Sequence, residues 1–265
     1  MTTEKTKVHF TDNHLINPTN PVTVNVIGAG GTGSKVLTAL MEMNHSLNEM
    51  EHPGLQVRLW DDDIITSANL GRQRFAESEK GLYKSVALIN RCNRWMGTNW
   101  KAETKKFDWE RENHYPENVE ANIYISCVDS VSARFEIADI LKHKRHHNSN
   151  LKYWLDFGNT KDRGQAILST IGIVRQPNSE KYITVENLPF ITDEFGDLLK
   201  QSEQNDDTPS CSVAEALEKQ DLFINSSLAQ MGCSLLWNLF RYGLTPYRGF
   251  FHNLKDFNTH PLKID

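Results

Sequence analysis

Gly28-Ala29-Gly30-Gly31-Thr32-Gly33 is the stretch that decides the fold of this 265-residue chain. It follows the short β-branched run 22–27, which predicts a buried strand, and it precedes an amphipathic helix expected over 33–43. A glycine-rich turn between a strand and a helix exposes backbone N–H groups where the helix dipole also favours an anion. The stretch therefore predicts a phosphate-binding turn, and a purely structural turn is the alternative.

Strand and helix patterns alternate along the rest of the chain. Short apolar runs predict further strands, and three-and-four spacing of apolar residues predicts further helices. The expected strands cover 55–60, 123–128, 153–157 and 165–171, and the expected helices cover 81–95, 132–141 and 222–242. This alternation predicts an α/β fold with a doubly wound, mostly parallel sheet of the Rossmann type.

The remaining segments complete an expected single domain over residues 1–265. The polar segment 45–54 predicts a loop, and residues 247–254 predict an edge strand among antiparallel strands at the C-terminal end. Residues 192–211 are acidic and poor in apolar side chains, which predicts a mobile loop.

The composition excludes several classes of protein. Lys and Arg number 29 against 34 for Asp and Glu, a formal net charge of −5, whereas a general nucleic-acid binder usually carries a basic surplus. No apolar stretch approaches the roughly 20 residues of a membrane helix, and the N-terminus lacks an apolar signal core, which predicts a cytoplasmic location. The cysteines are Cys92, Cys127, Cys211 and Cys233. Because they are not closely paired, neither a structural zinc site nor a disulfide framework is expected.

Polar residues cluster after the second expected strand. Asp61 stands at the end of that strand, where a carboxylate can accept hydrogen bonds from ribose hydroxyls. Amide and cationic side chains follow it, namely Asn69, Arg72, Gln73, Arg74 and Lys84. An enzyme that cleaves ATP between its α and β phosphates needs such donors, because negative charge builds on the phosphates in the transition state. The cluster therefore favours ATP chemistry over hydride transfer from a nicotinamide.

At these residues the sequence resembles the ThiF/MoeB/HesA family, which is related to the ubiquitin-activating enzymes. The matching motifs are, in order, the glycine-rich turn, Asp61-Asp62-Asp63, Asn69-Leu70-Gly71-Arg72-Gln73, the helix lysine Lys84, and Asp129 with Arg134. The match spans about residues 22–135 and continues weakly to about residue 240. Segments 209–217 and 221–225 also resemble the ThiF-like proteins of bacterial PRTRC gene clusters.

The resemblance implies an activity, cofactors and partners. The implied reaction is adenylation, by ATP with Mg²⁺, of the C-terminal glycine carboxylate of a small ubiquitin-like protein, in a homodimer. Asp129 would hold Mg²⁺, and Arg72 and Lys84 would act with it in catalysis. The implied nucleotide-binding residues are Gly28, Gly30, Gly31, Gly33, Asp61, Asp63, Asn69, Arg72, Gln73, Lys84, Asp129 and Arg134.

Cys211 lies in a segment, Pro209-Ser210-Cys211-Ser212, that resembles the one carrying the thioester cysteine of ubiquitin-type activating enzymes. The resemblance implies that 192–211 is a crossover-like loop and that Cys211 accepts the activated acyl group. A helix N-terminus after Cys211 would favour its thiolate. The alternative is a small buried thiol or a helix cap, and the other three cysteines are expected in the core.

Several site residues also have purely structural interpretations. Lys84 could be an ordinary surface lysine, Asp129 could cap the helix after it, and Arg134 could pair with a nearby carboxylate. The combined order and spacing favour the functional interpretation.

The sequence departs from the family pattern at three points. It lacks the paired C-x-x-C motifs of many members, and Ser130 replaces the usual asparagine. No arginine precedes Arg58, whereas many members carry an N-terminal arginine that reaches the ATP of the neighbouring subunit. Two other functions stay open: a pseudo-enzyme that binds nucleotide and a ubiquitin-like partner without catalysis, and an NAD-dependent oxidoreductase.

Overall fold

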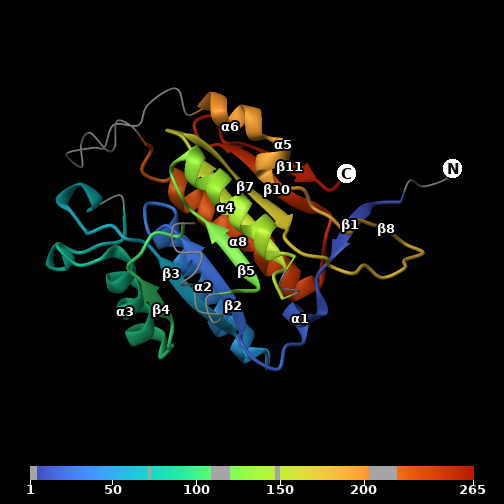
Figure 1. The fold of residues 1–265 in the computed structure, drawn as a ribbon, viewed down its shortest axis with the longest axis horizontal. Helices are drawn as coiled ribbons and strands as arrows, with labels where there is room; N and C mark the ends of the chain where they lie inside the picture. The colour runs from blue at the N-terminus through green and yellow to red at the C-terminus, as the bar shows by residue number, and fades with distance from the viewer. Residues whose placement is uncertain (1–4, 71–72, 109–119, 147–149, 203–219) are drawn as a thin grey trace.

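The computed structural model describes residues 5–70, 73–108, 120–146, 150–202 and 220–265. Strands of this part of the chain form one large sheet (Figure 1). Across the sheet they are β11 (Asn258–Lys263), β10 (Tyr247–Asn253), β7 (Arg163–Thr170), β6 (Tyr153–Asn159), β5 (Ile123–Ser126), β2 (Val22–Ile27), β3 (Leu55–Trp60) and β4 (Lys101–Glu103). The five strands from β6 to β4 are parallel, and β7, β10 and β11 are antiparallel to their neighbours. The predicted α/β fold is confirmed.

Helices cover both faces of the sheet. One face carries α2 (Gly33–Glu49), α3 (Lys84–Met96) and α8 (Ile224–Tyr242), and the other carries α4 (Val131–Lys144), α5 (Ile191–Glu194) and α6 (Gly196–Ser202). Alternate side chains of β2 enter the two cores. Val24 and Val26 pack on the α2 side, whereas Ile27 packs on the α4 side, as the two-residue repeat of a strand requires.

A smaller sheet lies at the end of the large one. Its strands are β8 (Ile183–Thr184), β1 (Lys7–Phe10) and β9 (Leu244–Thr245), and α1 (Asn13–Ile16) follows β1. The 3₁₀ turns η1 (Ser67–Asn69) and η2 (Glu77–Glu79) lie between β3 and α3. The sequence patterns did not predict these short elements.

The expected loop over 45–54 is wrong in its first half, because α2 continues to Glu49. Leu47 is buried one turn after Met43, so the apolar face extends by another turn. The Oδ1 atom of Asn44 accepts a hydrogen bond from the Leu55 backbone at 2.7 Å, so polar residues here join α2 to β3.

Two predictions for the C-terminal half are corrected. Residues 247–253 are not an edge strand, because β10 pairs with β7 on one side and β11 on the other. The described part of the expected 192–211 loop is largely helical, in α5 and α6. Ile191 and Leu199 are buried there and anchor these short helices to the α4 face. The rest of the 192–211 segment lies outside the described residues.

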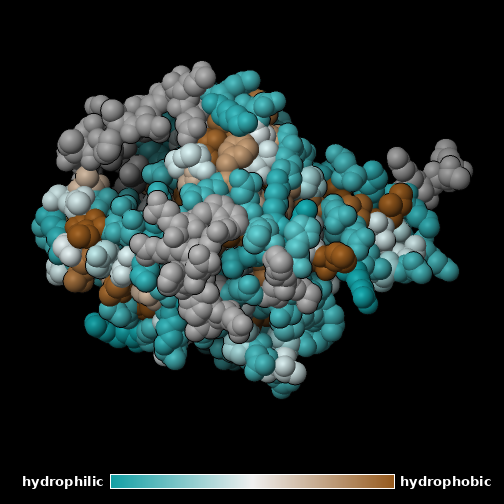
Figure 2. Space-filling model, in the orientation of Figure 1, coloured by the Kyte–Doolittle hydropathy of each residue, from teal (hydrophilic) through white to brown (hydrophobic). Residues whose placement is uncertain are grey.

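The visible face of the molecule is mostly hydrophilic, with separate hydrophobic areas (Figure 2). Ile64, Leu82 and Tyr83 are exposed apolar residues of the excursion between β3 and α3. None of the helices that the structure describes is both long and apolar enough to cross a membrane.

Candidate nucleotide site

The strand order places the site at one edge of the sheet. From β2 the chain moves outward to β3, and it later returns to β5 on the other side of β2. Ligands of such sheets bind at the carboxyl ends of the strands, at the point where the strand order reverses. Ile27 pairs with Trp60 and with Ser126, so Gly28 lies between the residues that follow β3 and β5.

The glycine turn is packed tightly at its two ends. Gly28 has a φ of +97°, and a Cβ atom there would lie 2.7 Å from the Cys127 carbonyl oxygen. A Cβ atom on Gly33 would lie 1.9 Å from the carbonyl oxygen of Gly28. Both glycines are therefore required by the fold itself, because no side chain fits against these backbone atoms.

Gly30 has a different environment. Apart from its two chain neighbours, no atom of the described residues lies within 4 Å of a Cβ atom built on it, so the packing of the described residues does not require glycine there. The space beside this residue is open, and it adjoins the N-terminus of α2. A phosphate can approach the backbone at this position, and the helix dipole would stabilise its charge.

Asp61 lies beside this turn as predicted. Its carboxylate accepts hydrogen bonds from the Ala29 backbone at 2.6 Å and from the Asp63 backbone at 3.0 Å. Burial raises the pKa of the Asp61 carboxyl to about 6, although these hydrogen bonds and the nearby Lys84 oppose the shift. An ionised carboxylate has lone pairs left after two such bonds, so it can still accept from a sugar hydroxyl.

Lys84 is not an ordinary surface lysine. It is the first residue of α3, its side chain is buried, and its Nζ atom lies 2.6 Å from the Asp63 carboxylate. Burying an ammonium group is costly unless it is paired, which explains the ion pair. The structure therefore brings Lys84, Asp63 and Asp61 together after β3.

Asn69 and Gln73 lie on the same excursion with different exposures. The Asn69 Oδ1 atom accepts from the Thr66 backbone at 2.8 Å and fixes the η1 turn, so its amide nitrogen is the group that it can offer a phosphate. Gln73 is buried, and its Oε1 atom has no hydrogen-bond partner among the described residues. The expected contact of Gln73 with nucleotide stays a prediction.

Asp129 follows β5 and is exposed, whereas Ser130 caps α4 by accepting a hydrogen bond from the Ala133 backbone at 3.2 Å. The alternative that Asp129 is the helix cap is therefore wrong. Its carboxylate stands at the carboxyl end of β5, beside the strand that leads into the glycine turn.

Arg134 is buried and acts within the protein. Its Nε atom donates to the Asp156 carboxylate at 3.1 Å, and its Nη2 atom donates to the Val128 and Phe157 carbonyls. Ser126 donates to the same carboxylate at 2.5 Å. The structure thus forms the pairing with a carboxylate that the structural alternative expects, between α4 and β6. The contact of Arg134 with nucleotide stays a prediction.

Two predicted catalytic residues, Arg72 and Cys211, lie outside the described residues. The other cysteines are placed as expected. Cys92 and Cys233 are buried and Cys127 is largely so, and burial raises the pKa of Cys92 to about 11 and of Cys233 to about 12. These thiols are therefore not activated nucleophiles.

Sequence reasoning missed two residues of the site, Thr32 and Asn225. Asn225 lies near the start of α8, and its Oδ1 atom accepts a hydrogen bond from the Thr32 hydroxyl at 2.7 Å. The available signal was an asparagine on the otherwise apolar, buried face of a helix.

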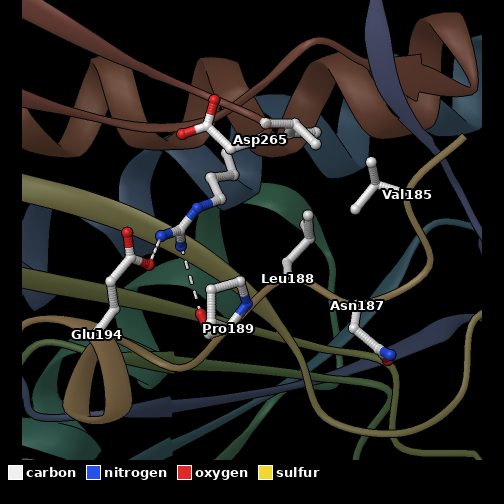
Figure 3. A pocket seen from close by; sticks show the side chains of 8 residues that line it. Val185, Asn187, Leu188, Pro189, Glu194 and Asp265 are labelled. Atoms are coloured by element: carbon white, nitrogen blue, oxygen red, sulfur yellow. Dashed lines mark hydrogen bonds and ion pairs between the residues drawn. The ribbon is translucent and has the colours of Figure 1, made fainter. Parts of the chain in front are cut away.

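A small cavity elsewhere does not compete with this site. It lies between the segment 185–194 and β10, and it is lined by residues such as Leu188, Glu194 and Arg248 (Figure 3). Arg248 forms an ion pair with Glu194 and donates to the Pro189 carbonyl at 3.3 Å. Its volume is about 100 Å³, whereas ligand pockets usually measure roughly 300 Å³ or more.

A profile of the ThiF family matches residues 19–260. The chain belongs to the ThiF family. The matched region includes both the glycine turn and α8, so it spans most of the elements of the fold. A comparison with curated protein sequences finds no match.

Solved structures with the same fold include PaaA and the MccB of Escherichia coli. MccB solved with MccA and MccB solved with ATP each have a TM-score of 0.58 and 16% identity, and each alignment covers 95% of this chain and 65% of that chain. PaaA has a TM-score of 0.59 and 14% identity, with 92% and 64% covered. At these identities the likeness shows the fold, and this chain spans about two thirds of the length of those proteins.

Proposed function

We propose that this ThiF-family protein binds ATP at the carboxyl edge of β2, β3 and β5 and adenylates a carboxylate. The observation that carries the proposal is the space beside Gly30, which no described residue fills and which adjoins the α2 N-terminus. Packing among the described residues does not require a glycine at this position. Asp61 and Asp129 stand at the flanking strand ends. A fold that leaves such a space beside a helix N-terminus is suited to a phosphate chain.

The described residues have distinct proposed roles. Asp61 accepts hydrogen bonds from the ribose hydroxyls, and the backbone of the glycine turn binds the phosphates. Lys84 exchanges its ion pair with Asp63 for a phosphate oxygen, and Asn69 donates its amide. Arg72 adds a further cation according to the family motif.

Asp129 is the residue that would hold Mg²⁺. Among the described residues, no group of three or more acidic, histidine or cysteine side chains could hold a metal ion. Mg²⁺ is commonly held by one or two carboxylates together with substrate phosphates, so an exposed single carboxylate fits that mode. Bound there, Mg²⁺ would neutralise charge on the phosphates.

The proposed reaction is a substitution at the α-phosphorus. A substrate carboxylate oxygen forms a bond to that phosphorus while the bond to the bridging oxygen breaks, and pyrophosphate leaves with the electron pair. No general base is needed, because the carboxylate is already ionised at neutral pH. Positioning by the turn and neutralisation by Lys84 and Arg72 therefore supply the catalysis.

The proposed substrate is the C-terminal glycine of a small ubiquitin-like protein, bound by a homodimer of this chain. The family motifs support this choice, and E. coli MccB has been solved with both ATP and MccA. We extend the proposal to thioester formation on Cys211, with AMP as the leaving group.

Pyrophosphate exchange tests the adenylation step. The protein should incorporate labelled pyrophosphate into ATP only with Mg²⁺ and a small protein that ends in Gly-Gly. Asp129→Ala should abolish exchange and leave the fold intact, whereas Asp139→Asn, which changes an exposed carboxylate on α4, should leave exchange unchanged. Exchange retained in Asp129→Ala with normal Mg²⁺ dependence would contradict the metal role.

The same assay separates the alternatives. A pseudo-enzyme would bind ATP and its partner without exchange, and an oxidoreductase would bind a nicotinamide cofactor. For the thioester, the adduct formed with ATP should disappear with reducing agent and in Cys211→Ala. An adduct that survives Cys211→Ala would overturn that assignment.

A further inference from the structure

The first turn of α8 reaches across to the glycine turn. We propose that Asn225 is a positioning residue that holds the turn in its nucleotide-binding shape, an inference that rests on the function proposed above. Asn225 is 1% exposed on a helix whose buried face is otherwise mostly apolar. A buried amide must be hydrogen-bonded, so its partners show what it holds in place.

The amide of Asn225 joins segments that are far apart in the sequence, and its Oδ1 atom also accepts a longer hydrogen bond from the Asn159 Nδ2 atom on β6 at 3.5 Å. Its Oδ1 atom accepts from the Thr32 hydroxyl at 2.7 Å, and its Nδ2 atom donates to Gln220 Oε1 at 2.8 Å. Thr32 is the residue directly before α2 and is itself buried. The turn is thereby tied to the segment that leads into α8.

Asn225 also explains the glycine at position 31. A Cβ atom on Gly31 would lie 2.7, 2.9 and 3.0 Å from the Nδ2, Cγ and Oδ1 atoms of Asn225, which are its three nearest neighbours. Gly31 does not have a positive φ. The absence of a side chain at Gly31 is therefore required by the Asn225 amide, whereas Gly28 and Gly33 are required by backbone atoms.

The two central glycines of the turn consequently differ. Gly30 faces open space, and Gly31 packs against Asn225. The buried Lys35 side chain also contacts this peptide, because its Nζ atom donates to the Gly31 carbonyl at 3.2 Å. Binding groups must be held within about 0.5 Å of their productive positions, so a wall behind Gly31 sets how well the turn binds phosphate.

Compensating substitutions test this role. Gly31→Ala should weaken binding of a fluorescent ATP analogue by about tenfold or more, because the new methyl displaces either the turn or Asn225. Adding Asn225→Ala should restore part of that affinity, since it removes all three clashing atoms. Gly28→Ala and Gly33→Ala are the matched controls, and Asn225→Ala should restore neither, because their clashes are with backbone.

A second pair of variants tests the hydrogen bond without a clash. Thr32→Val removes the donor at nearly constant volume, and Thr32→Ser keeps it. Thr32→Val should raise the KM for ATP in pyrophosphate exchange several-fold with a smaller change in kcat, and Thr32→Ser should resemble the wild type. A purely structural role would lower the melting temperature without this difference between KM and kcat.

The outcomes separate this inference from the proposed function. Wild-type protein that binds ATP, with no relief in the Gly31→Ala/Asn225→Ala protein, would overturn the role of Asn225 alone. Wild-type protein that does not bind ATP would overturn both. If Gly31→Ala does not fold, the two Thr32 variants decide, and equal KM values for them would overturn the role.

Discussion

Asp61 accepts two backbone hydrogen bonds beside the glycine turn, and burial raises the pKa of its carboxyl to about 6. Ribose hydroxyls are bound best by the ionised form, so the Asp61 contribution is nearly complete one pH unit above its pKa of about 6 and is lost as the pH falls through that value. We expect ATP affinity to fall by about tenfold more in the wild type than in Asp61→Asn between pH 7 and pH 5. Because ATP is titrated into both proteins at each pH, the protonation of ATP itself affects both affinities equally. Equal pH dependence of the two proteins would contradict the role of Asp61.

Arg134 and Asp156 form a buried ion pair with side chains 5% and 1% exposed. Burial raises the pKa of Asp156, although Arg134 opposes that shift. Arg134→Met should lower the free energy of unfolding by about 3–5 kcal/mol at pH 7, because it leaves a buried carboxylate unpaired. The loss should be smaller in Arg134→Met/Asp156→Asn, measured by urea unfolding. A double variant as unstable as Arg134→Met would show that the unpaired charge is not the cause.

At the scale of elements, the glycines of the turn between β2 and α2 have different roles. Packing requires some of them, and another is free to face the ligand. Gly33→Ala places a methyl 1.9 Å from the Gly28 carbonyl oxygen, whereas in Gly30→Ala no atom of the described residues other than its chain neighbours lies within 4 Å of the methyl. Gly33→Ala should therefore lower the free energy of unfolding by about 1–3 kcal/mol, a typical cost of overpacking. Gly30→Ala should leave stability within about 0.5 kcal/mol of the wild type and weaken ATP binding. Thermal unfolding and ATP titration of both variants check this contrast, which unchanged affinity in Gly30→Ala would contradict.

The bounds of the strands also show how much of the fold could be predicted from the sequence. The strands 22–27 and 55–60 have the predicted bounds, because short β-rich runs of alternating apolar residues end at Gly28 and at Asp61. The strand β10 has nearly the predicted bounds, but it was predicted at the edge of the sheet and lies inside it. Its own sequence cannot distinguish the two positions, because they differ only in whether a further strand, β11, pairs with it. The small sheet around β1 is built from two- to four-residue strands, which are too short to show a pattern.

The positions of the candidate site residues in the fold were predictable where these residues follow strands. Asp61 and Asp129 are located by strand ends, which the local pattern reveals. The family resemblance assigned Arg134 to nucleotide, and the local sequence could not identify its partner Asp156, which lies on a strand later in the chain. Asn225 was missed for the same reason, since only tertiary packing brings α8 to the turn.

At the scale of the molecule, α8 connects the candidate nucleotide site with the N-terminal segment. Its first turn carries Asn225, and near its other end the Leu239 carbonyl accepts a hydrogen bond from the Thr11 hydroxyl at 3.0 Å. The N-terminal segment is held in turn by His9, which is fully buried. Its Nδ1 atom lies 2.7 Å from the Val185 carbonyl, and its Nε2 atom lies 2.9 Å from the Tyr153 hydroxyl. Docking of this segment therefore depends on an imidazole that joins three parts of the chain.

This arrangement predicts the pH dependence of overall stability. Burial lowers the pKa of His9 below its ordinary value of 6.5, although the Val185 carbonyl and Asp12 oppose the shift. The unfolded chain then binds a proton that the folded protein does not, so the His9 contribution is complete above pH 6.5 and is lost as the pH falls below it. Between pH 6.5 and pH 5 the free energy of unfolding should fall more steeply in the wild type than in His9→Gln, by up to about 1.4 kcal/mol per pH unit. The comparison cancels the other histidines, because both proteins share them, and parallel stability curves would show that His9 is protonated equally in both states.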